Sequence, residues 1–238
     1  MSTALVTGGS SGIGLEVVKQ LLDRDYTVVS LDVQNPGFSR KGFEYQKVDL
    51  TDIEQTKKVC KEMANRNITT VIHNAGVIRP ALLADVKLED FDALVNLHLK
   101  AAVLLMQATL PAMKAANYGR VVLVSSRAVL GLPTRTSYSA TKAGMLGMAR
   151  TWALELAPSG ITVNVVAPGP VRTANFHSVI PEGSPQVEKV AQAIPVKRLG
   201  EVEDVARAIL FFAAKEAGFI TGQVLYVCGG TSVGTLTL

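Results

Sequence analysis

The sequence predicts a single α/β domain built on a seven-stranded parallel, doubly wound sheet with helices on both faces. Short β-branched runs alternate with longer amphipathic segments along the 238 residues, which is the order expected of strand–helix–strand crossovers. The runs are continuously apolar, as in parallel strands covered on both faces. Right-handed crossovers then distribute the helices over both faces. Because no repeat or linker interrupts the pattern, we expect one domain over residues 1–238.

The predicted strands, in chain order, are 4–7, 27–31, 43–47, 70–73, 120–124, 162–167 and 224–227. The predicted helices are 13–24, 53–65, 88–115, 137–156 and 202–213. The stretch 173–198 has a weak helical pattern and contains Gly183 with Pro181, Pro185 and Pro195. Since a long irregular insert in a compact domain is often functional, we predict a mobile substrate loop there.

Composition argues against several classes of function. Lysine and arginine are scattered and the net charge is only +4, so no nucleic-acid partner is expected. No uninterrupted apolar run reaches the roughly 18 residues of a membrane span, so no membrane partner is expected. Cys60 and Cys228 lie far apart without metal-ligand spacing, which predicts free thiols and no metal. The first residues already enter a strand pattern, and we therefore expect a cytoplasmic protein without a signal peptide.

A glycine-rich turn follows the first predicted strand. Residues 8–14 read Gly-Gly-Ser-Ser-Gly-Ile-Gly, and a helix follows. Glycine permits a tight turn and lets the backbone approach a pyrophosphate closely. The helix N-terminus offers unpaired N–H groups and the positive end of its dipole to that anion. Strand, turn and helix together therefore predict a Rossmann-type dinucleotide site, whereas a glycine turn alone would be weak evidence.

Asp32 ends the next predicted strand, about twenty residues beyond the glycines. A carboxylate at this place accepts hydrogen bonds from an adenosine ribose and repels the 2′-phosphate of NADP. Ser11, Val33 and Gln34 supply no cation to offset that repulsion. The sequence therefore favours NAD over NADP, although a solvated strand-end carboxylate is the simpler alternative for Asp32 alone.

Tyr138 and Lys142 stand four residues apart in a predicted helix and so share one face. A free tyrosine, with a pKa of about 10, is a poor base near neutrality, and a nearby ammonium favours the phenolate. We expect Lys142, together with a positively charged nicotinamide, to lower the pKa of Tyr138. Ser125 and Ser126 close the preceding strand, at the sheet edge that borders the ligand crevice in such folds. A hydroxyl there would bind the reacting oxygen, and Asn96 is either a satisfied core amide or part of a proton path.

The chain resembles the short-chain dehydrogenase/reductase family, in its compact single-domain form. The matching segments extend over nearly the whole length: the glycine turn with Thr7, Asp49, the run Asn74-Ala75-Gly76, the tetrad of Asn96, serine, Tyr138 and Lys142, the stretch from Pro168, and the terminal glycines. The resemblance implies a catalytic set of Asn96, Ser126, Tyr138 and Lys142. Together with Asp32, it implies a cofactor site of Thr7, Gly8, Ser11, Gly12, Ile13, Gly14, Asp32, Val33, Asp49, Leu50, Asn74, Ala75, Gly76, Tyr138, Lys142, Pro168, Gly169, Val171 and Thr173.

The roles of these residues also follow from the resemblance. Tyr138 would exchange the proton, Lys142 would hold the nicotinamide ribose, the serine would orient the reacting oxygen, and Asn96 would hold a water that leads to solvent. Ser126 is preferred to Ser125, although the gap to Tyr138 is one residue shorter than in many members. A homotetramer or homodimer is also implied.

The resulting expectation is an NAD(H)-dependent oxidoreductase that interconverts a small-molecule alcohol and a ketone or aldehyde. One alternative is a 3-oxoacyl reductase acting on carrier-bound thioesters; Pro158-Ser159 stands where such enzymes often carry a basic residue. The other is a non-catalytic dinucleotide-binding protein. The substrate pocket is expected to include Leu130, Leu132, Pro133, Arg79, Phe176, His177 and Val179, with Arg79 or His177 available to a carboxylate.

Overall fold

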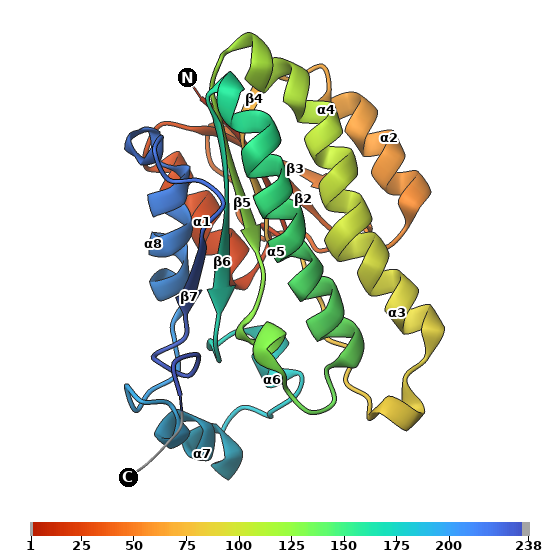
Figure 1. Cartoon of the computed structure of the whole chain (residues 1–238), viewed down its shortest axis with the longest axis vertical. Coiled ribbons are helices and arrows are strands. Elements are labelled where there is room, and N and C mark those ends of the chain that lie inside the picture. The colour runs from red at the N-terminus through yellow and green to blue at the C-terminus, as the bar shows by residue number, and fades with distance from the viewer. Residues whose placement is uncertain (1, 235–238) are drawn as a thin grey trace.

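A computed structural model describes residues 2–234 and contains the predicted seven-stranded parallel sheet. The strands are β1 (Thr3–Thr7), β2 (Thr27–Asp32), β3 (Phe43–Lys47), β4 (Ile68–His73), β5 (Gly119–Val124), β6 (Ile161–Pro168) and β7 (Val224–Val227). Their order in the sheet is β3-β2-β1-β4-β5-β6-β7, and every neighbouring pair is parallel. All seven predicted strands are confirmed, within two residues at each end (Figure 1).

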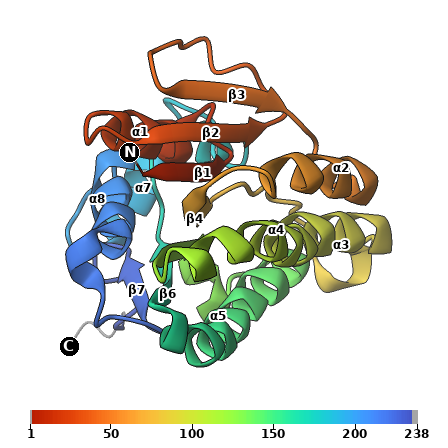
Figure 2. The same cartoon turned by 90° about the horizontal axis from the view of Figure 1, so that it is seen from above.

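Helices cover both faces of the sheet, as the doubly wound prediction requires. The helices of the predicted set are α1 (Gly12–Leu22), α2 (Ile53–Met63), α3 (Leu88–Val95), α4 (Ala101–Ala115), α5 (Thr136–Leu156) and α8 (Val202–Ala213). Figure 2 shows α1 and α8 on one side of the sheet and α2 to α5 on the other. Two separate buried cores result, one beneath α1 and α8 and one beneath α2, α4 and α5.

The predicted helix 88–115 is interrupted by a π-helical turn at Asn96–Lys100, and the prediction of one regular helix was wrong there. A π-turn inserts one extra residue into the hydrogen-bond ladder without needing glycine or proline, so periodicity gives little warning of it. Such turns are frequent at functional sites. Within it, the side chains of Leu97 and His98 are buried.

The stretch Leu88–Ala115 also passes a membrane-span test by composition, with a window of mean hydropathy 1.4, contrary to the expectation that no stretch would qualify. Leu94, Leu105 and Met113 are nevertheless fully buried against the rest of the fold. The high hydropathy is thus accounted for by packing of a core helix within the domain.

The insert 173–198 contains two helices, α6 (Ala174–His177) and α7 (Pro185–Ala193), where we predicted irregular chain. Pro185 is the first residue of α7. A proline at that position loses no helical hydrogen bond and presets the backbone for the helix, so it starts α7 instead of breaking it. Figure 1 shows both helices beyond the carboxyl ends of the strands.

The order of strands reverses between β1 and β4. In an open parallel sheet this switch point leaves a crevice at the carboxyl ends of the two strands, where ligands bind. The glycine turn follows β1, and Asn74 follows β4. The fold therefore places both segments at the same edge, with α6 and α7 nearby.

Candidate active site

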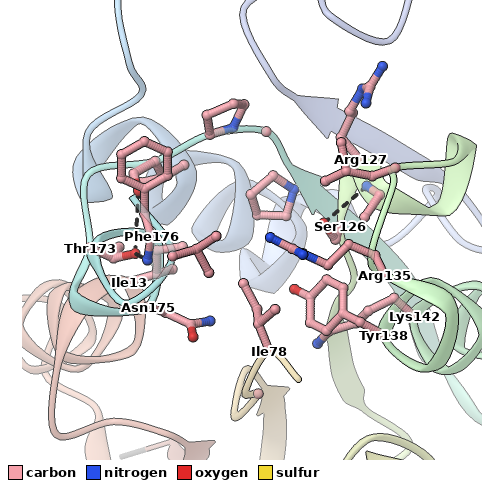
Figure 3. Close-up of a pocket in the computed structure, with 18 of the residues that line it drawn as sticks. Ile13, Ile78, Ser126, Arg127, Arg135, Tyr138, Lys142, Thr173, Asn175 and Phe176 are labelled. Carbon is pink, nitrogen blue, oxygen red and sulfur yellow. Dashed lines mark hydrogen bonds between the residues drawn. The ribbon is translucent and has the colours of Figure 1, made fainter. Parts of the chain in front are cut away.

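A cavity of about 730 Å³ opens at the carboxyl ends of the strands (Figure 3). Its wall comes from the glycine turn, the ends of β4, β5 and β6, the start of α5, and the insert. It brings together thirteen of the predicted site residues: Gly8, Ser11, Gly12, Ile13, Asn74, Gly76, Ser126, Tyr138, Lys142, Pro168, Gly169, Val171 and Thr173. Segments more than 160 positions apart in the chain thus meet in one place.

The other predicted residues lie outside this wall: Thr7, Gly14, Asp32, Val33, Asp49, Leu50, Ala75 and Asn96. Two of them, Thr7 and Ala75, support the wall from behind. The Thr7 hydroxyl accepts the backbone N–H groups of Asn74 and Ala75, both at 3.0 Å, and so joins β1 to β4. Asp32, Val33, Asp49 and Leu50 follow or end β2 and β3, on the side of the sheet where an adenosine would lie.

The glycine turn fits a dinucleotide pyrophosphate. Gly8 and Gly12 have φ values of +68° and +52°, which glycine adopts without cost. A Cβ on Gly14 would lie 1.9 Å from the Gly8 carbonyl oxygen, so no larger residue fits there. Helix α1 has no side-chain cap from Ser11 and no acidic residue in its first turn. Its first N–H groups and dipole are therefore available to an anion.

The carboxylate of Asp32 is fixed at the end of β2 by two backbone groups. One oxygen accepts the N–H of Ser10 at 2.9 Å and the other accepts the N–H of Gln34 at 3.0 Å. Within residues 2–234, no lysine or arginine forms an ion pair with Asp32. The Asp32 carboxylate is therefore fixed directly against the glycine turn by its hydrogen bond to Ser10.

Asn96 is tied to the loop that follows β3. Its amide Nδ2 donates to the Thr51 carbonyl at 3.0 Å, while Asp49 accepts the backbone N–H and the hydroxyl of Thr51 at 2.9 and 2.7 Å. The ammonium of Lys142 has a different partner, since it donates to the Val124 carbonyl at 2.7 Å. Among residues 2–234, the Asn96 side chain is thus bonded to the loop after β3, and no hydrogen bond joins it to Lys142.

Ser125 and Ser126 have different surroundings. The Ser125 hydroxyl is buried and donates to the Lys142 carbonyl at 2.8 Å, which ties β5 to α5. The Ser126 hydroxyl accepts the N–H of Ala128 at 3.1 Å and lies beside Tyr138, whose pKa it lowers. Only Ser126 is therefore placed to reach an oxygen that Tyr138 also contacts.

Burial and two polar neighbours act on the ionisation of Tyr138. Burial, the largest influence, raises its pKa, and the Ser126 hydroxyl and the charge of Arg135 lower it in part. Burial also lowers the pKa of Lys142, to about 7. Lys142 Nζ lies 5.8 Å from the centre of the tyrosine ring. The predicted cation is therefore present near the phenol, and the charge of Arg135 acts on it as well.

Two buried residues near Tyr138 were missed in the sequence. Arg135 lines the cavity three positions before Tyr138, and only this i, i+3 spacing gave a signal. His98 lies on the π-turn, where its Nδ1 bonds the Thr141 hydroxyl at 2.8 Å and its ring packs edge-on to Tyr138. Burial and Lys142 both hold the pKa of His98 far below its usual range. Its ring is therefore neutral.

The expected substrate pocket is correct in part. Leu132, Pro133, Phe176 and Val179 line the cavity, whereas Leu130, His177 and Arg79 do not. Arg79 instead pairs with Asp90 at 3.5 Å on the surface. Neither His177 nor Arg79 is therefore placed to meet a substrate carboxylate in the cavity.

Comparison with known proteins agrees with this geometry. A family model described as enoyl-(acyl carrier protein) reductase matches residues 8–232. The 3-oxoacyl-[acyl-carrier-protein] reductase of Thermotoga maritima is 37% identical over 238 residues, which is 95% of this chain and 96% of that protein. The (2S)-[(R)-hydroxy(phenyl)methyl]succinyl-CoA dehydrogenase subunit of Thauera aromatica is 36% identical, over 97% of this chain and 96% of its own.

Solved structures give the same result. A short-chain dehydrogenase/reductase family protein superposes with a TM-score of 0.89 at 30% identity, covering 98% of both chains. A putative NAD(P)-dependent gluconate 5-dehydrogenase from Beutenbergia cavernae, with bound NADP, superposes with a TM-score of 0.90 at 30% identity, over 98% of this chain and 97% of its own.

Proposed function

The chain belongs to the short-chain dehydrogenase/reductase family, and from this premise we propose that it is an NAD(H)-dependent oxidoreductase that interconverts an alcohol and a ketone or aldehyde. The observation that carries the proposal is the position of Tyr138, Ser126 and Lys142 in one cavity that also contains the glycine turn. A proton donor, an oxygen-orienting hydroxyl and a buried ammonium are the groups that carbonyl reduction needs at one place.

In reduction, a hydride adds to the carbonyl carbon, the electron pair of the C=O π bond moves to the oxygen, and the Tyr138 hydroxyl donates its proton to that oxygen. In oxidation, the phenolate takes the proton from the alcohol. Ser126 holds the same oxygen by a hydrogen bond, so the reacting group is oriented before the proton moves. A bound nicotinamide dinucleotide would supply the hydride in one direction and accept it in the other.

Lys142 has a positioning role in this proposal. Its ammonium is 2% exposed and donates to the Val124 carbonyl at the end of β5. A Cβ on Gly76 would lie 3.2 Å from Lys142 Nζ, so the lysine lies directly beside the Asn74–Gly76 segment at the end of β4. From this place it can hold a ribose hydroxyl that approaches along the crevice.

The preference for NAD rests on Asp32. Its carboxylate is held rigidly at the end of β2 without a cation to offset it, and a 2′-phosphate beside it would meet like charge. The Beutenbergia protein binds NADP, and so the preference is a property that we assign to this chain from its own Asp32. Asp49, Leu50 and Val33 would complete the adenosine side.

A second candidate is a 3-oxoacyl thioester reductase. The name of the Thermotoga protein favours it, whereas Asp32 and the lack of a basic residue at Pro158-Ser159 favour a substrate without an acyl carrier. A direct test compares simple ketones with acetoacetyl-coenzyme A, each with NADH and with NADPH, and follows the absorbance of the reduced cofactor.

The proposal expects turnover of at least one free ketone or alcohol and a higher kcat/KM with NAD(H). Turnover confined to the thioester would establish the second candidate instead. Cofactor binding without turnover of any carbonyl or alcohol would identify a non-catalytic dinucleotide-binding protein and overturn both enzymatic proposals.

A further inference from the structure

The cavity carries an unbalanced charge. Three cationic residues line it, namely Arg127, Arg135 and Lys142, and among the described residues no aspartate or glutamate does so. Proteins seldom bury cations without a partner, because removing a charge from water costs several kcal/mol. We therefore expect at least one of these cations to bind an anion that is not part of the chain.

Two of the three cations are already accounted for. Lys142 donates to the Val124 carbonyl and belongs to the proposed catalytic group. Arg127 donates to the carbonyls of Thr231 and Gly131 at 3.3 and 3.4 Å. Figure 3 shows the guanidinium of Arg127 pointing out of the cavity and that of Arg135 pointing into it.

Arg135 is only 8% exposed. Its Nη1 donates to the carbonyl of Thr134 at 3.3 Å and to the hydroxyl of the same residue. Within residues 2–234, its Nε and Nη2 have no hydrogen-bond partner and no carboxylate forms an ion pair with it. The Nε and Nη2 edge of the planar, permanently charged guanidinium is thus free to bind a ligand in the cavity.

The backbone that presents Arg135 is strained and firmly held. Thr134 has a φ of +66°, which is a true outlier for a β-branched residue. Its carbonyl accepts the N–H of Ala81 at 3.0 Å, and the carbonyl of Arg135 accepts the N–H of Ser139 at 2.7 Å. Strain that is fixed on both sides in this way is typical of a preorganised ligand site.

We propose, building on the function proposed above, that Arg135 binds a carboxylate of the substrate, and that the substrates are oxo acids and the matching hydroxy acids. Residues three apart at the start of a helix have Cβ atoms about 5–6 Å apart. A carboxylate on Arg135 therefore lies within a few bonds of the oxygen on Tyr138. Leu132, Phe176, Val179 and Ile180 give the remainder of the cavity an apolar lining for the rest of the molecule.

The test uses matched pairs of substrates. A series of 2-oxo and 3-oxo acids of increasing chain length, beginning with pyruvate and acetoacetate, is compared with the corresponding methyl esters under NADH. Esterification removes the charge and leaves the reacting ketone in place. The variants are Arg135→Gln, Arg135→Lys and Arg127→Gln. Arg127→Gln is the control, because it also removes a positive charge from the cavity wall, but the guanidinium of Arg127 points outward (Figure 3).

The wild-type protein should prefer at least one acid over its ester by about tenfold or more in kcat/KM, since hydrogen bonds to charged groups contribute about 1.5–3 kcal/mol. Arg135→Gln should abolish that preference chiefly through KM and retain turnover of the ester. Arg135→Lys should restore part of it, and Arg127→Gln should leave it unchanged. Preference for every ester, or an equal loss on acid and ester in Arg135→Gln, would overturn the inference.

Calorimetric titration with acetoacetate and pyruvate separates this inference from the proposed function. If no carbonyl compound is turned over, the proposed function fails. Binding of either acid that is lost in Arg135→Gln and kept in Arg127→Gln would then still support the carboxylate site. Binding that is absent, or equal in both variants, would overturn it.

Discussion

The buried groups around Tyr138 determine when this residue can act as a base. Burial raises the pKa of the phenol, and the positive charge of Arg135 lowers it. His98 beside it is neutral, and burial lowers the pKa of Lys142 to about 7. The phenolate takes the proton from the alcohol, so oxidation should rise with pH through the pKa of Tyr138.

Removing Arg135 should move this rise to higher pH. Without the cation the phenolate loses a stabilising charge, so the pKa of Tyr138 increases. We expect the pH profile of kcat for oxidation of a neutral alcohol to shift upward in Arg135→Gln and to stay in place in Arg127→Gln. A neutral alcohol is used because its binding does not depend on the guanidinium. An unchanged or downward shift would show that Arg135 does not act on Tyr138.

Asp32 is the residue that we expect to choose the cofactor. Replacement by alanine removes the charge that faces a 2′-phosphate, so the ratio of kcat/KM for NADH over NADPH should fall by about fivefold or more. That ratio corresponds to about 1 kcal/mol of charge repulsion. Steady-state kinetics with each cofactor give this ratio, and fluorescence titration gives the affinity for each cofactor. Tighter binding of NADPH than of NADH by the wild-type protein would contradict the assignment.

Among the elements, those specified by local patterns were predicted well. Short runs rich in β-branched or aromatic residues marked all seven strands, and the glycine turn marked the start of α1. The π-turn at Asn96–Lys100 was missed because its cause is packing rather than a residue type. Helix α7 was missed because proline was read as a breaker, although Pro185 stands at the one position where it favours a helix.

The insert 173–198 remains the predicted moving element. Its buried residues Ala191 and Ile194 form a small cluster with Leu199, which follows the insert, apart from the two cores beneath the sheet. Such a cluster stabilises a segment less than a large core does, so local opening should be easy. Phe176 and Val179 from the same segment line the cavity, so closing over a ligand would exclude water from the reacting groups.

Hydrogen exchange tests this element directly. Amides of residues 173–198 should exchange faster than those of β5 and β6 in the free protein. They should become more protected with NAD⁺ and an accepted alcohol present. Strong and equal protection with and without ligands would show that the segment is a fixed part of the fold.

At the scale of the whole molecule, the site depends on contacts that no local pattern reveals. Tyr138, Lys142, Ser126 and the glycine turn were predicted because each belongs to a spaced motif. Arg135 was not predicted, because a single arginine before a helix is no recognisable motif. Its position depends on the neighbouring Thr134, whose carbonyl accepts the N–H of Ala81 from a distant segment. The place of Asn96 was likewise determined by a distant partner, the Thr51 carbonyl.

The family membership and several exposed apolar side chains lead us to predict a homotetramer. Leu154 on α5 is 82% exposed and Phe219, before β7, is fully exposed. Large apolar groups at the surface often mark contacts between copies. Light scattering at micromolar concentration should give about four times the chain mass of 25.3 kDa. A mass near that of one chain would contradict self-association. A mass of twice that of one chain would show a homodimer instead of the homotetramer.

The central claim is that Tyr138 is the acid and base of a carbonyl–alcohol oxidoreductase. Tyr138→Phe removes one hydroxyl and leaves the ring to pack against His98, so the fold and the cofactor site should be preserved. The decisive measurement is kcat of this variant on a substrate that the wild-type protein turns over, with cofactor binding measured in parallel. We expect NADH to bind as before and kcat to fall by roughly 10²–10⁴-fold, the loss typical of a missing general acid. Near-normal kcat with intact cofactor binding would contradict the mechanism.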